Sequence, residues 1–81
     1  MTTIYLLWSR PKGSRVWTIH HHTPFKADDK LDAKFPGARH REIPAYKNSR
    51  CTDPEGVIRS IETDARLDGL ETHVSIFEIP D

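Results

Sequence analysis

The hydrophobic residues of this chain fall into groups separated by turn-forming residues. Positions 3–8 are hydrophobic at nearly every residue, which is typical of a central strand covered on both faces. Positions 15–21 combine β-branched and aromatic residues, and the intervening Pro11-Lys12-Gly13 is a turn sequence. Residues 3–21 are therefore predicted to form an antiparallel β-hairpin.

The clearest helix pattern begins at Thr52 or Asp53. Thr52 and Glu55 have the spacing of a capping box, whereas the alternative places Asp53 at the N-cap with Pro54 as the first helical residue. Hydrophobic residues then recur at intervals of three and four until Gly69, which is a natural end. The hydrophobic stripe consists of Val57, Ile58, Ile61 and Ala65.

The last group, residues 72–79, alternates as a strand with hydrophobic residues on both faces. The element order is thus β-β-α-β, which predicts an α+β domain with a three- or four-stranded antiparallel sheet and one helix packed on one face. In the three-stranded form the spatial order is 2-1-3. The other face has no second helix to cover it, so we predict an uncovered contact surface that carries Tyr5, Leu7 and Phe77.

Residues 23–50 form an irregular segment that three prolines interrupt, so a long helix does not fit. Residues 28–35 can make one or two helical turns, and residues 39–43 can make a short edge strand. A loop of this length is usually either functional or disordered, and the sequence leaves both alternatives open.

The length of 81 residues predicts a single domain spanning residues 1–81. A domain this small is marginally stable unless a homodimer or another bound partner adds to its core. Twelve basic and twelve acidic residues balance, which excludes a strong overall field toward nucleic acid or an anionic membrane. The single Cys51 excludes an internal disulfide, and no hydrophobic run is long enough to span a membrane. We therefore expect a cytoplasmic protein.

The run His20-His21-His22 is the most distinctive local motif. In a regular strand, His20 and His22 project to the same side about 6.5–7 Å apart, a spacing at which two imidazoles can share one Zn²⁺. No second paired motif supplies further ligands, so the sequence predicts no metal cofactor and leaves His20 and His22 as the candidate ligands. A third ligand would have to come from His40, Cys51, His73 or Asp28.

Two copies of the pattern H-x-[ST] occur, at His21-His22-Thr23 and at His73-Val74-Ser75. They resemble the catalytic motifs of the 2H phosphoesterases, although that family has two repeated lobes and a longer chain. The resemblance implies that His21 and His73 act as the acid–base pair while Thr23 and Ser75 hold the phosphate. An enzyme of this kind is one alternative function.

Basic residues gather in the middle of the chain, whereas acidic residues concentrate toward its end. Phe35 and Tyr46 lie among the cations, and stacking aromatic residues with basic ones are typical of a groove for single-stranded nucleic acid. Binding of single-stranded nucleic acid through residues 34–50 is therefore a second alternative. The cations are Lys34, Arg39, Arg41, Lys47 and Arg50.

The size, element order and mixed charge are similar to those of small phage-encoded inhibitor proteins, such as RNA-polymerase inhibitors and anti-CRISPR proteins. That resemblance implies a non-enzymatic protein that binds a larger protein or nucleoprotein complex and modulates it. This is our leading hypothesis, and it requires no cofactor. Because aromatic and arginine side chains dominate interface energetics, the expected contact residues are Trp17, Arg39, Arg41 and Tyr46.

Overall fold

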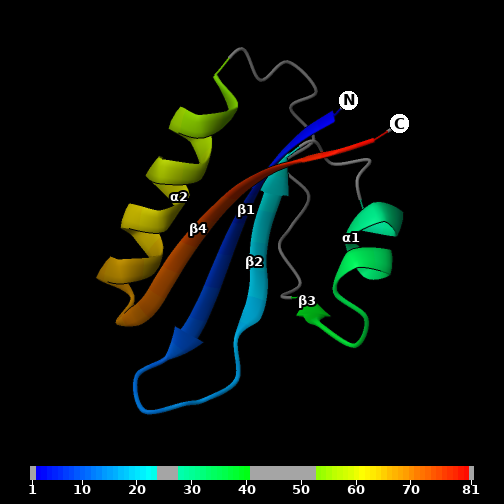
Figure 1. Ribbon diagram of the computed structural model, residues 1–81. Coiled ribbons are helices and arrows are strands. Elements are labelled where there is room, and N and C mark those ends of the chain that lie inside the picture. Colours follow the sequence, from blue (N-terminus) through cyan, green and yellow to red (C-terminus); the bar gives the residue numbers. More distant parts are fainter. Residues whose placement is uncertain (1, 24–27, 41–52, 81) are drawn as a thin grey trace.

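The computed structural model of the protein describes residues 2–23, 28–40 and 53–80 (Figure 1). Within them a mixed four-stranded sheet has the spatial order β3-β2-β1-β4. No helix in these ranges is both long and hydrophobic enough to cross a membrane. The elements are β1 (Thr2–Pro11), β2 (Thr18–Thr23), α1 (Asp28–Lys34), β3 (Arg39–His40), α2 (Pro54–Leu67) and β4 (Leu70–Ile79).

The prediction of an α+β domain with one main helix is confirmed, but that of a purely antiparallel sheet is wrong. β1 pairs antiparallel with both β2 and β4, whereas β3 pairs parallel with β2. The chain passes through α1 between β2 and β3, and such a crossover returns it in the same direction. The predicted order β-β-α-β is therefore replaced by β-β-α-β-α-β, and β3 joins the sheet outside β2.

Local signals explain where the predicted elements begin and end. The turn at residues 11–13 closes with a hydrogen bond from the Ser14 amide to the Pro11 carbonyl, and Gly13 has a positive φ of 84°. The Asp53 carboxylate caps α2 by accepting a hydrogen bond of 3.1 Å from the Gly56 amide. Asp53 is thus the N-cap; Thr52, the alternative, lies outside the described residues.

The α2 helix covers one face of the sheet. Alternate residues of β1 point to this face, and Leu7 there lies between His21 of β2 and Val74 of β4. Ile58 of α2 is fully buried, and Thr72 of β4 donates a hydrogen bond of 3.1 Å to Glu62 of α2. We call this side the α2 face.

The opposite side, the α1 face, is also covered, so the prediction of an uncovered sheet face is wrong. Leu31 of α1 is fully buried against Ile4, Leu6 and Ile19 in the main hydrophobic cluster. Figure 1 shows the two helices on opposite sides of the sheet. The short helix that forms within the proline-interrupted segment provides this cover. Of the residues expected to be uncovered, Leu7 is fully buried, and Tyr5 and Phe77 are half-buried.

Candidate functional site

The candidate site lies on the α1 face, at the end of the sheet near the β1–β2 turn. β1 supplies Arg10, and β4 supplies Glu71 directly opposite it together with His73, which is opposite Trp8. Trp17 immediately precedes β2. Because these residues surround one indole ring, we call them the Trp17 surface. It consists of Arg10, Trp17, Glu71 and His73.

The Arg10 guanidinium holds the Trp17 surface together. Its Cζ lies 4.4 Å from the centroid of the Trp17 ring, and its Nε donates a hydrogen bond to the Glu71 carboxylate. The ring of His73 approaches Trp17 edge-on, with 6.4 Å between the centroids. An arginine stays charged at all physiological pH values, so the cation–π contact persists throughout that range. Trp17 is therefore held in place while part of it stays accessible to solvent.

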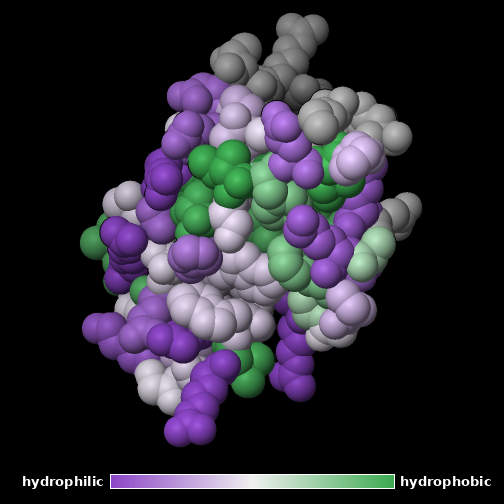
Figure 2. Space-filling view, in the orientation of Figure 1, coloured by the Kyte–Doolittle hydropathy of each residue, from purple (hydrophilic) through white to green (hydrophobic). Residues whose placement is uncertain are grey.

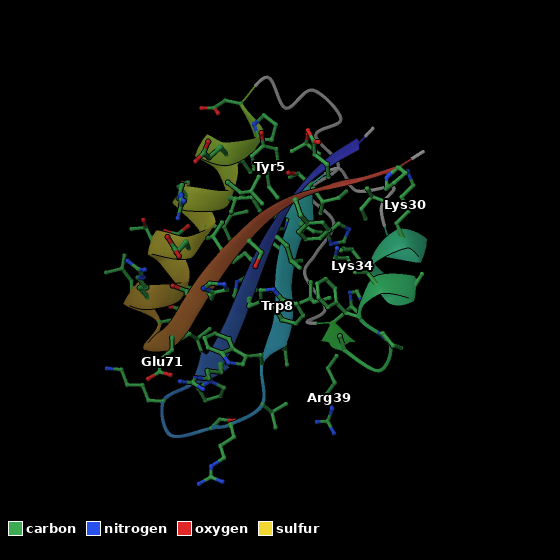
Figure 3. The ribbon with its side chains drawn as sticks, in the orientation of Figure 1. Tyr5, Trp8, Lys30, Lys34, Arg39 and Glu71 are labelled. Atoms are coloured by element: carbon green, nitrogen blue, oxygen red, sulfur yellow. The ribbon has the colours of Figure 1, made fainter. Side chains whose placement is uncertain are left out.

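Further aromatic residues continue the surface toward α1. Phe35 meets Trp8 edge-on at 5.2 Å and Phe77 at 6.0 Å. The Nζ of Lys34 lies 4.5 Å from the centroid of the Phe77 ring. In Figure 3, Trp8 lies between Glu71 at the start of β4 and Lys34 on α1. These aromatic rings pack against the main hydrophobic cluster, so the Trp17 surface adjoins well-packed side chains.

Charge is distributed unevenly between the β1–β2 loop, beside the Trp17 surface, and α2 on the other face of the sheet. The exposed Lys12 and Arg15 lie in the β1–β2 loop, which also contains Trp17. The α2 helix and the residues that flank it are more acidic, with five carboxylates against Arg59 and Arg66. Figure 2 shows hydrophobic residues in the upper half of the visible face and residues of intermediate hydropathy below them. The acidic residues in and beside α2 are Asp53, Glu55, Glu62, Asp64 and Asp68.

The structure brings only part of the predicted contact set together. Trp17 belongs to the surface, but Arg39 does not, because it pairs with Thr18, which is opposite Ser9 on the α2 face. Lys34, from the basic segment, lies over Phe77. The other predicted contact and cation residues lie outside the described residues: Arg41, Tyr46, Lys47 and Arg50.

Sequence reasoning missed Arg10 and His73 as members of the site. The alternation of β1 places Arg10 two residues beyond Trp8 on the same face, and that signal was available. The position of His73 depended on the register of β4 against β1, which pairs His73 with Trp8. A register between strands so distant in sequence cannot be derived from local patterns.

A bulge in β2 separates the two histidines that were expected to share a side. Leu7 is opposite His21 and Trp8 is opposite Ile19, so His20 is an extra residue in the strand. His20 lies on the α2 face, where its Nδ1 is 2.9 Å from the Ser9 hydroxyl.

His22 lies opposite Leu6 on the α1 face, so the prediction that His20 and His22 project together is wrong. In the described ranges, no group of three or more histidine, cysteine or carboxylate side chains is placed to hold a metal ion.

His21 lies on the α2 face and is almost completely buried. Burial is the main cause that lowers its pKa to about 4, and the neighbouring His22 and His20 add smaller repulsions. His21 is therefore a neutral imidazole at pH 7, which fits a side chain that packs within the fold.

The two H-x-[ST] motifs do not meet in one site. His21 and Thr23 are opposite Leu7 and Tyr5, which point to the α2 face. His73 and Ser75 are opposite Trp8 and Leu6, which point to the α1 face. The body of the sheet therefore lies between the two motifs, and this arrangement cannot place a phosphate between both histidines.

The buried Ser9–His20 hydrogen bond joins a hydroxyl to an imidazole beside a shallow hollow on the α2 face. Ser9 is only 2% exposed, and the bond ties the bulged residue of β2 to β1. Its evident role is structural. The hollow is lined by Ser9, Pro11, Thr18, Asp68 and Leu70.

Comparisons of this chain with protein-family models, with curated proteins and with solved structures find no match.

Proposed function

We propose that this protein is a non-enzymatic interaction protein that binds a partner protein through the Trp17 surface and thereby modulates a larger complex. The observation that carries the proposal is the half-buried Trp17 ring at the surface, with the Arg10 guanidinium 4.4 Å from its centroid. Tryptophan and arginine are the residue types that most often dominate the energetics of protein interfaces.

The rigidity of the Trp17 surface supports this function. Arg10, Glu71 and His73 project from the paired strands β1 and β4, and Trp17, which precedes β2, is held by contacts with Arg10 and His73. Ordering side chains on association costs about 0.5–1.5 kcal/mol for each flexible one, so an interface that is already ordered binds more tightly. The ion pair between Arg10 and Glu71 gives the surface both signs of charge, which suits a partner of mixed charge.

The test compares two neighbouring substitutions in partner capture from source-cell extract. Trp17→Ala removes the indole, whereas Val16→Ala trims an exposed side chain one residue away. Proteins retained by the wild type and by Val16→Ala, but lost from Trp17→Ala, are the partners that use this surface. For each of them, titration calorimetry should show a loss of at least about 2 kcal/mol of binding free energy for Trp17→Ala.

Equal retention by both variants would contradict the proposal. Circular dichroism and a denaturant titration of Trp17→Ala must accompany the capture. They separate a lost contact from a lost fold, because Trp17 is half-buried.

The second candidate function is binding of single-stranded nucleic acid. The exposed Lys12 and Arg15 in the same loop as Trp17 favour it, because cations combined with a stacking aromatic ring suit a flexible polyanion. A fluorescein-labelled oligonucleotide would then bind with an affinity that falls steeply between about 50 and 200 mM salt. Trp17→Ala and Arg15→Ala should both weaken this binding, whereas a protein interface should change little with salt.

The partner's identity stays a prediction. The resemblance to phage-encoded inhibitors predicts a target in host transcription or CRISPR machinery. Binding assays with purified host RNA polymerase and with purified CRISPR effector complexes would test that prediction directly.

A further inference from the structure

The β4 strand is a long edge of the sheet in the part of the chain that the structure describes. It spans ten residues and pairs with β1 along its whole length without a register shift. Natural proteins usually prevent an edge strand from pairing with another chain by a bulge, a proline, charged side chains or a covering element. Between Leu70 and Ile79 there is no bulge against β1 and no proline, and the two charged side chains, Glu71 and Glu78, lie near the ends of the strand. β4 is therefore suited to accept another strand.

Exposed hydrophobic side chains accompany this edge on the α2 face. Ile76 of β4 is 48% exposed, and Val57 in the first turn of α2 is 39% exposed. The α2 helix lies over β4 on this side of the sheet (Figure 1). A strand added to β4 would thus meet the exposed Ile76 side chain as well as the backbone groups of β4 that point away from β1.

We propose that the occupant of this edge is β4 of a second copy of the chain, paired antiparallel about a two-fold axis at Ser75. Such an axis is perpendicular to the sheet, so the α2 faces of both copies lie on the same side. Directly opposed residues in an antiparallel pair share a face. The two faces of β4 alternate along the strand, so two opposed residues must both have odd numbers or both have even numbers.

The register centred on Ser75 satisfies this condition and pairs residues 71–79 of the two copies. It places Val74 opposite Ile76 twice on the α2 face. On the α1 face it places His73 opposite Phe77. Pairs of β-branched side chains, and of an aromatic residue with a neighbouring ring, stabilise antiparallel strands by about 0.2–1 kcal/mol each.

Charge also favours a second copy as the occupant. Glu71 has an odd number and Glu78 an even number, so alternation places them on opposite faces of the sheet. A symmetric register therefore never places Glu71 of one copy opposite Glu78 of the other. The chain as a whole has a formal net charge of zero, so two copies do not repel each other at long range. In the register centred on Ser75, β4 of a second copy already places hydrophobic residues opposite each other, whereas an unrelated strand would need a complementary sequence of its own.

The dimer would extend the sheet to eight strands, twice the four of one copy. It would present two Trp17 surfaces on the same side of that sheet, because both α1 faces point the same way. The inference does not rest on the proposed function, because its evidence is the outer edge of β4; Glu71 and His73 are the two residues of the Trp17 surface that lie in the paired segment.

The first experiment measures molar mass by sedimentation equilibrium from about 1 µM to 1 mM protein. The chain mass is 9.3 kDa, and we expect the mass to rise to twice this value with concentration. Ile76→Lys places a charge against Val74 of the other copy and should weaken the dimer at least about tenfold. The matched control is Val16→Lys, at an exposed side chain in the loop between β1 and β2, which should dimerise like the wild type.

The second experiment tests the register by a disulfide. In a Cys51→Ser background, Ser75→Cys places two thiols opposite each other, with about 4.5–5.5 Å between Cα atoms, within the range that a disulfide bridges. Mild oxidation should then give a covalent dimer. Glu78→Cys is the control, because the two copies of residue 78 lie about 20 Å apart in this register and should not crosslink.

A chain that stays monomeric at 1 mM would overturn the inference. So would a dimer that withstands Ile76→Lys, or one in which Ser75→Cys crosslinks no better than Glu78→Cys. Circular dichroism confirms in each case that the variant is folded.

Discussion

At the scale of single residues, His21 makes stability depend on pH. Its pKa falls from 6.5 in the unfolded chain to about 4 in the fold, so the folded state requires the neutral imidazole. The contribution is complete above pH 6.5 and is lost as the pH falls toward 4, by up to roughly 3 kcal/mol. Urea titrations at pH 7.5 and pH 4.5 should show the lower free energy of unfolding at pH 4.5.

Two substitutions assign this pH dependence to one imidazole. His21→Gln should flatten the difference between pH 7.5 and pH 4.5, because glutamine does not titrate. His73→Gln, which changes an exposed imidazole on the α1 face, is the matched control. An unaltered pH dependence in His21→Gln would show that another group is responsible.

The contact between Asp53 and Gly56 predicts a non-additive pair of substitutions. Replacing glycine by alanine within a helix normally stabilises it by about 0.5–1 kcal/mol. Here a Cβ at position 56 would overlap the capping carboxylate of Asp53, so Gly56→Ala should displace the cap and gain little. Without the cap, in Asp53→Ala, the same change should be stabilising.

A double-mutant cycle by thermal unfolding measures this coupling. Asp53→Ala alone should cost about 1 kcal/mol, and Asp53→Asn, which still caps, should cost much less. Additive effects of Asp53→Ala and Gly56→Ala would contradict the predicted overlap.

At the scale of elements, the sequence correctly predicted those whose ends are marked by local capping or turn residues. Asp53 and Gly69 delimit α2, and Gly13 closes the hairpin turn. β2 was placed correctly as a strand, but it begins at Thr18 rather than at residue 15. The bulge at His20 was not predictable, because it exists only in the pairing of β2 with β1.

The cover of the α1 face was missed for a related reason. Residues 28–35 and 39–43 were predicted as a short helix and an edge strand, and the structure has α1 and β3 there. A helix of seven residues is not stable by itself and forms because Leu31 docks on the sheet. Local patterns do not show where such a helix packs, and the same limit hid His73 from the predicted site.

Docking of α1 is testable by one pair of identical substitutions. Leu31→Ala removes a fully buried side chain and should cost about 2–5 kcal/mol of unfolding free energy. Leu67→Ala makes the same change in α2 at a side chain that is 80% exposed, and it should cost less than about 0.5 kcal/mol. Similar costs for both, measured in urea, would show that α1 does not cover the sheet.

At the scale of the whole molecule, a small core and a long open edge have a common consequence. The domain buries a main cluster of four residues, with partly buried rings around it, so its own stability is limited. Pairing of β4 with a second copy would add hydrophobic contacts to each domain without lengthening the chain. Folding and dimerisation would then be linked, as in many small dimeric domains.

This linkage predicts that the thermal midpoint rises with protein concentration. For a native dimer that unfolds to two free chains, a tenfold increase in concentration adds about 1.4 kcal/mol of stability per mole of dimer. Scans from about 5 to 500 µM should therefore show a steady upward shift of the thermal midpoint. Ile76→Lys should remove the shift, because a monomer unfolds independently of concentration.

Since the lysine lies at a half-exposed position, the variant should still unfold cooperatively, and its midpoint should lie near the wild-type value at the lowest concentration. A wild-type midpoint that is constant across the whole range would mean that the edge of β4 stays open in solution.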